Sequence, residues 1–194
     1  MPAIIEGFSE VLGILKELAS GVKAIANIPA NERKVMNDAI ADTAELVDET
    51  LTILKQHLTT VVSELRFGDK QNAKRMIYEL GDFRGWEDKY RRFQLCESLH
   101  EAVRNLDRIG VYKIVNNLAF NDPGVIHQRL FDYIGGETNA ARSVGTMLQS
   151  LTPLADSVDS ELEMVVKKLE EARNEVGKWR QAFIDLELEI RNSI

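Results

Sequence analysis

Residues 151–190, LTPLADSVDSELEMVVKKLEEARNEVGKWRQAFIDLELEI, decide the expected fold. Apolar side chains recur there at alternating spacings of four and three residues, from Leu154 to Ile190, which places them on one face of an α-helix. Thr152 and Pro153 suit the cap and the first position of this helix, so we expect it to span residues 153 to 192. At the usual rise it would be about 55 Å long, and such a helix buries its apolar face by packing alongside others.

The same apolar periodicity recurs in three further segments, near residues 3 to 26, 30 to 66 and 85 to 119. Shorter helical patterns cover about 70 to 80 and 124 to 151. No segment alternates apolar and polar residues for long enough to predict a strand. We therefore predict an all-α fold, an elongated up-and-down four-helix bundle with short helical insertions.

The breaks between these segments carry their own signals. Pro29 has the backbone angle of a first helical turn, and Asn27 or Asn31 is expected to cap the second helix. Gly68 suits the left-handed position that follows a helix, and Asp69 is expected to cap the next one.

The composition is that of an ordinary soluble domain. A chain of 194 residues, 44% hydrophobic and 28% charged, can bury one core, so we expect residues 1 to 194 to form a single domain. A net charge of -7 disfavours nucleic acid as a partner. Cys96 is the single cysteine and cannot form an intramolecular disulfide, which favours the cytoplasm. No apolar stretch is long enough for a membrane-spanning helix.

Glu97 and His100 form a Glu-x-x-His motif, the spacing found in carboxylate-bridged metal bundles. Such bundles need a second pair and further Glu ligands from other helices. Neither His57 nor His127 has an acidic residue three positions before it, so the second pair is missing. We predict that the chain binds no metal or other cofactor.

A nucleophilic cysteine is the other chemical candidate, since Cys96 lies four residues before His100. Cys96 is expected in the middle of a helix, whereas reactive thiolates are commonly stabilised at helix N-termini. The sequence also contains no phosphate-binding loop, dinucleotide fingerprint or Gly-x-Ser-x-Gly motif. We therefore expect no enzyme activity and identify no small-molecule substrate.

Trp86, Tyr90 and Phe93 recur on one side of the helix expected over 85 to 119, and Arg91 and Arg92 lie beside them. Basic and aromatic side chains together can hold nucleic acid or lipid headgroups, but acidic residues are interleaved here and dilute the charge. We predict that this aromatic stripe binds a protein partner or a second copy of the chain. The alternative is that the stripe packs as core beneath the insertion at 124 to 151.

The segment 3 to 26 supports a second functional hypothesis. It is amphipathic and contains Gly7, Gly13 and Gly21, each of which weakens a helix by about 1 kcal/mol relative to Ala. A mobile N-terminal amphipathic helix on a four-helix bundle resembles the membrane-disrupting HeLo and MLKL-type cell-death bundles. The resemblance implies a membrane surface as partner, whereas simple burial in the core explains the same apolar face.

Overall fold

The computed structural model describes residues 3–24, 28–81 and 140–192. All regular elements in these ranges are helical, which confirms the all-α prediction. They are α1 (Ala3–Ala24), α2 (Ala30–Phe67), α3 (Lys70–Leu80), α8 (Ala140–Leu151), the 3-10 helix η2 (Thr152–Ser157) and α9 (Leu162–Arg191). The helix expected over 85 to 119 lies outside the described residues, so the four-helix arrangement that includes it stays a prediction.

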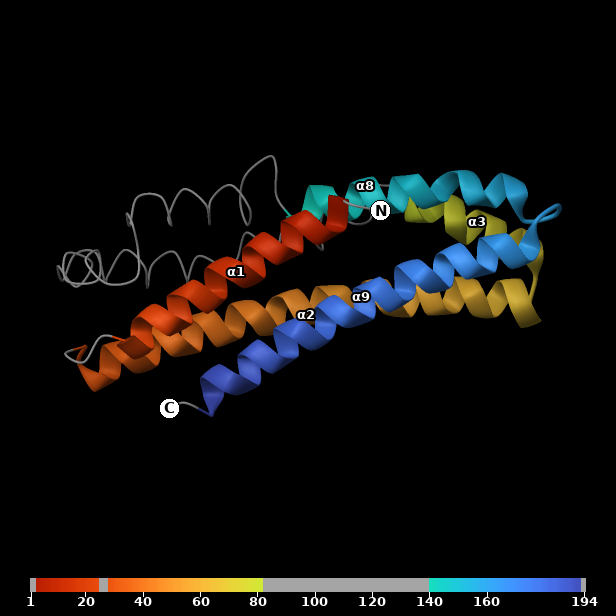
Figure 1. The fold of residues 1–194 in the computed structure, drawn as a ribbon. Helices are drawn as coiled ribbons and strands as arrows, with labels where there is room; N and C mark the ends of the chain where they lie inside the picture. Colours follow the sequence, from red (N-terminus) through yellow and green to blue (C-terminus); the bar gives the residue numbers. More distant parts are fainter. Residues whose placement is uncertain (1–2, 25–27, 82–139, 193–194) are drawn as a thin grey trace.

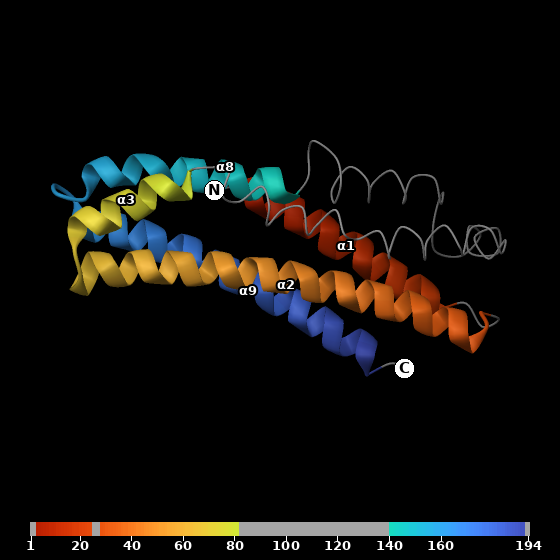
Figure 2. The same cartoon turned by 180° about the vertical axis from the view of Figure 1, so that it is seen from behind.

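An antiparallel pair of long helices, α2 and α9, forms the spine of the described structure (Figures 1 and 2). α1 has 22 residues against 38 in α2, so it covers little more than half the length of α2. At the other end of the spine, α3, α8 and η2 pack together, α3 contacts α2, and η2 contacts α9. α1 also contacts α8, so the shorter helices form one layer over the spine.

The predicted apolar face of α9 is the face that is buried. Its side chains at alternating spacings of three and four residues are almost wholly removed from solvent: Val165, Leu169, Ala172, Val176, Phe183, Leu186 and Ile190. α2 supplies the matching face, with buried side chains that include Leu51, Leu54, Leu58, Val61 and Leu65. Two faces of the same periodicity therefore form one continuous core between the two helices.

The prediction that the last helix begins at Pro153 is wrong. Pro153 lies in η2, and α9 begins only at Leu162, after a turn. Proline has no N–H to continue the hydrogen-bond ladder of α8, so the chain tightens into a 3-10 helix at this point. α9 thus contains 30 residues, and its length is about 45 Å rather than the 55 Å expected.

Asp69 is confirmed as a cap, whereas Asn31, Gly68 and Thr152, which lies inside η2, do not have the roles predicted for them. The carboxylate of Asp69 accepts a hydrogen bond from the Gln71 N–H at 2.8 Å, as a helix cap should. Asn31 lies inside the first turn of α2, whose N-cap is Pro29 and has no side-chain cap, while Asn27 lies outside the described residues. Gly68 has φ of -117°, which is not the left-handed conformation predicted for it.

A close approach explains the glycine at position 68 better than its backbone angles do. The Glu64 carboxylate folds over Gly68 and accepts a hydrogen bond from the Asp69 N–H at 3.1 Å. A Cβ on residue 68 would overlap this carboxylate. Glycine therefore leaves room for Glu64 to hold the corner between α2 and α3.

α1 packs its apolar face into the bundle, as the core-burial alternative predicts. Its buried side chains are Phe8, Val11, Leu12, Ile14, Leu15, Leu18 and Val22. The Phe8 ring lies 6.2 Å from both Trp179 and Phe183 of α9, measured between ring centroids. At about 1.5–3 kcal/mol per large apolar side chain, burial of this face contributes on the order of 10 kcal/mol. None of the helices in the described residues is both long enough and apolar enough to cross a membrane.

The corner that precedes α9 is tied to α3 by two polar contacts. The Tyr78 hydroxyl donates a hydrogen bond to the Asp156 carboxylate, and the Lys74 ammonium pairs with Asp159. The hydrogen bond to Asp156 raises the pKa of the Tyr78 phenol above its ordinary value of 10.0, with desolvation and the Asp156 charge acting in the same direction.

This shift predicts a specific loss of stability in alkali. Because the phenol has a higher pKa folded than unfolded, its contribution is present below about pH 10 and is lost as the pH rises through the folded value. We expect the wild-type protein to be more stable than Tyr78→Phe at pH 8, and the difference to shrink by pH 11. Urea unfolding of both proteins across that range measures it. A constant difference would contradict the assigned hydrogen bond.

Candidate functional site

The residues predicted to mediate interaction lie outside the part of the chain that the structure describes, as do the candidates weighed for metal binding and catalysis. These are Trp86, Tyr90, Arg91, Arg92, Phe93, Cys96, Glu97 and His100. Their roles stay predictions. Within residues 3–24, 28–81 and 140–192, no cluster of three or more His, Cys, Asp or Glu side chains is arranged to hold a metal ion.

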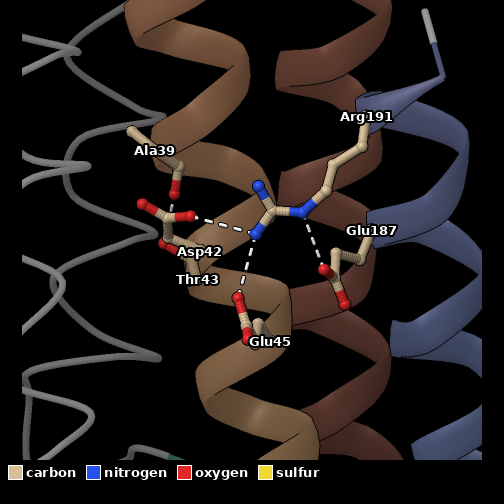
Figure 3. Close-up of polar contacts among 6 residues, drawn as sticks. All are labelled: Ala39, Asp42, Thr43, Glu45, Glu187 and Arg191. Carbon is tan, nitrogen blue, oxygen red and sulfur yellow. Dashed lines mark hydrogen bonds and ion pairs between the residues drawn. The ribbon is translucent and has the colours of Figure 1, made fainter.

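The last turn of α9 is held to α2 by a single arginine (Figure 3). The Arg191 guanidinium donates from Nη2 to Asp42 at 3.2 Å and to Glu45 at 2.9 Å, both on α2. Its Nε donates to Glu187 at 2.7 Å, four residues earlier on the same helix. The hydrogen bond to Glu187 is the largest cause that raises the pKa of Arg191, and the Asp42 contact adds to it.

Two further ion pairs join α2 and α9 nearer the middle and the far end. Arg180 pairs with Asp48 at 2.8 Å, and Arg66 pairs with Glu170 at 3.0 Å. Exposed or half-exposed pairs of this kind contribute about 0.2–1 kcal/mol each. Their main effect is geometric, because each pair forms in only one register of the two helices.

Beside the Arg191 contacts, α1, α2 and α9 enclose a groove of about 550 Å³. α1 contributes Lys16, Val22 and Lys23; α2 contributes Arg33 and Asn37; and α9 contributes Leu186, Glu189 and Ile190. Lys16 and Lys23 are seven positions apart, and both Arg33 with Asn37 and Leu186 with Ile190 are four apart, so each pair lies on one side of its helix. A volume of this size falls in the range of small-molecule sites.

The charge in the groove is opposite to that of the whole chain. Three cationic side chains, Lys16, Lys23 and Arg33, line it together with one carboxylate, Glu189, whereas the net charge of the protein is -7. Lys16 and Lys23 are exposed, and the side chain of neither forms an ion pair within the described ranges. The groove is thus a local positive site on an acidic protein.

Asn37 is the polar residue of α2 that lines the groove beside Arg33. The residue as a whole is only 7% exposed. An amide at the wall of a groove provides two donors and an acceptor for something that enters it.

Sequence reasoning missed this groove for a physical reason. Its residues come from three helices that are far apart in the sequence. Asn37 in α2 lies more than 150 positions before Glu189 in α9, yet both line the same groove. The available signal was small: Lys16 and Lys23 are seven residues apart, on one side of an amphipathic helix. Only the packing of α1 against α9 brings the three faces together.

Comparisons with protein-family models, with curated proteins and with solved structures find no match for this chain.

The Arg191 contacts predict a local rather than a global effect of mutation. In Arg191→Ala, α9 loses all three carboxylate contacts, so its last turn should open more often while the core between α2 and α9 persists. We expect faster amide hydrogen exchange over residues 186–191 and a loss of about 1 kcal/mol or less in the free energy of unfolding.

Lys178→Ala is the matched control, because Lys178 pairs with Glu175 of its own helix at 3.3 Å and, within the described residues, with no carboxylate of α2. It should leave exchange over residues 186–191 unchanged. Equal exchange in the wild type and Arg191→Ala would show that Arg191 does not hold this turn.

Proposed function

We propose that this chain is a non-enzymatic helical-bundle protein that acts by binding a protein partner or a second copy of itself. The observation that carries the proposal is Phe67, a large apolar side chain that is 85% exposed at the corner between α2 and α3. Leu188, Val35 and Tyr78 are further large side chains with substantial exposure on the described helices. Burial of such side chains by a partner would be favourable by about 1.5–3 kcal/mol each.

The predicted aromatic stripe extends this proposal. In the arrangement we propose, a helix over 85 to 119 completes an up-and-down four-helix bundle and presents Trp86, Tyr90 and Phe93, with Arg91 and Arg92 at the margin. Aromatic and arginine side chains are the types most often responsible for binding energy in protein interfaces. The proposal involves no nucleic acid and no cofactor, and it places the protein in the cytoplasm.

Self-association provides the direct test. We expect Trp86→Ala combined with Phe93→Ala, and separately Phe67→Ser, to weaken self-association by about 30-fold or more, as loss of an interface hot spot does. Light scattering over a concentration series measures the mass, and circular dichroism measures the helix content. Gln56→Ala, at an exposed polar position of α2, is the control and should behave as the wild type.

A wild-type protein that stays monomeric at its highest soluble concentration would contradict self-association. Loss of helix content in the Trp86 and Phe93 variant would show instead that the aromatic stripe is part of the core. If self-association is unchanged in all variants, neither Phe67 nor the aromatic stripe of Trp86 and Phe93 forms the interface.

A membrane-acting bundle that uses residues 3 to 26 is the alternative. It is favoured by the exposed cations Lys16 and Lys23 on the helix that also carries the apolar face from Phe8 to Val22. Gly13 supports it too, since a Cβ there would meet no atom within 4 Å, so glycine at this position weakens the helix without being required by packing. Detachment of α1 would expose its apolar face, at a cost on the order of 10 kcal/mol that insertion into a lipid interface would have to offset.

This alternative predicts that the full chain releases dye from anionic liposomes and that a chain lacking residues 1 to 26 does not. Gly13→Ala, which strengthens α1 as a helix without meeting a neighbour, serves as a folded full-length control. Absence of leakage by the full chain would eliminate the membrane hypothesis and leave the interaction proposal unaffected.

A further inference from the structure

We propose that the groove between α1, α2 and α9 is a binding site for a small amphiphilic anion, with a carboxylate or phosphate-monoester head on a single apolar chain. The inference stands on the geometry of the groove and is independent of the proposed interaction function. No residue in it belongs to the aromatic stripe.

The anionic head is specified by the polar side chains. Lys16 and Lys23 lie two helical turns apart, about 10 Å along α1, and Arg33 faces the same space from α2. A negative head placed among them gains charge-assisted hydrogen bonds. The Asn37 amide lines the same space and can donate a further hydrogen bond to the head.

The apolar chain is specified by the aliphatic side chains of the groove. Leu186 and Ile190 line it from α9, and Val22 lines it from α1. At about 30 Å³ per water molecule, a volume of about 550 Å³ has room for roughly 18 waters, far more than a free phosphate displaces. A ligand that fills the groove must therefore extend beyond its charged head, and these aliphatic side chains favour a hydrocarbon extension.

Glu189 is the acidic residue of the groove, so its substitution should affect anion binding in the opposite direction from substitution of the lysines. Its carboxylate lines the same groove from α9, so it repels an anion while the cations of α1 and α2 attract it. The head should therefore lie toward α1 and α2, and the chain toward α9. Neutralising Glu189 should tighten binding, whereas neutralising the cations should weaken it.

The test uses the full-length protein and four probes, each kept below its micelle concentration. Decanoate and decyl phosphate carry both head and chain, decanol carries the chain alone, and inorganic phosphate carries the head alone. Isothermal titration calorimetry measures affinity and stoichiometry. We expect one site per chain for decanoate and decyl phosphate, and at least tenfold weaker binding of decanol and of inorganic phosphate, because each lacks half of the contacts.

Variants then assign the site to the groove. We expect Lys16→Gln combined with Lys23→Gln to weaken decanoate binding about tenfold or more, and Glu189→Gln to strengthen it. Asn37→Leu should also weaken binding, since it removes the amide donors from the groove wall, and its thermal midpoint shows whether the variant folds as the wild type does. Lys34→Gln combined with Lys178→Gln removes two exposed lysines that do not line the groove and should change nothing.

Four results would overturn the proposal. If decanol binds as tightly as decanoate, the groove recognises only the apolar chain. If inorganic phosphate binds as tightly as decyl phosphate, the groove recognises only the anionic head. Equal weakening by the control pair of lysines would show non-specific attraction. Binding that is unchanged in Lys16→Gln/Lys23→Gln and in Asn37→Leu would place the ligand elsewhere.

Discussion

The structure depends on one constraint, the need of two long amphipathic helices to bury matching apolar faces. α2 and α9 each carry large side chains at spacings of three and four residues, and neither face can be covered within its own helix. Antiparallel contact covers both at once and forms the continuous core on which the other helices rest. α1 depends on this core directly, because Phe8 packs between Trp179 and Phe183 of α9.

Apolar burial alone does not choose the register of such a pair. Sliding one helix past the other by a turn would still match apolar faces, because the hydrophobic effect is not directional. The ion pairs are directional: Arg66 with Glu170, Arg180 with Asp48, and Arg191 with Asp42 and Glu45 all fail to form if α9 shifts by one turn. Pairs of modest individual energy thus select one of several similar packings. The selected register places Leu186, Glu189 and Ile190 of α9 beside α1 and α2, where they line the groove.

Local signals in the sequence were sufficient where the cause of the structure is local. The periodicity predicted α2 over 30 to 66 against the observed Ala30–Phe67, and Asp69 caps α3 as expected because a cap needs only the next few residues. The start of α9 was placed nine residues too early. That boundary depends on Tyr78 and Lys74, which lie far away in sequence and hold the residues after Pro153 against α3. The predicted left-handed conformation of Gly68 is also wrong, and there the glycine instead makes room for the Glu64 carboxylate, a side-chain position that the turn pattern does not specify.

The groove could not be predicted because no single segment carries it, and the interaction residues 86 to 93 lie outside the described residues. Its composition nevertheless separates folding from function. Lys16, Lys23 and Asn37 bring two cations and an amide to one space on a chain whose net charge is -7. The same space is lined by Leu186 and Ile190 of α9. A few polar groups that converge on a groove with aliphatic lining are the physical pattern expected of a small-molecule site.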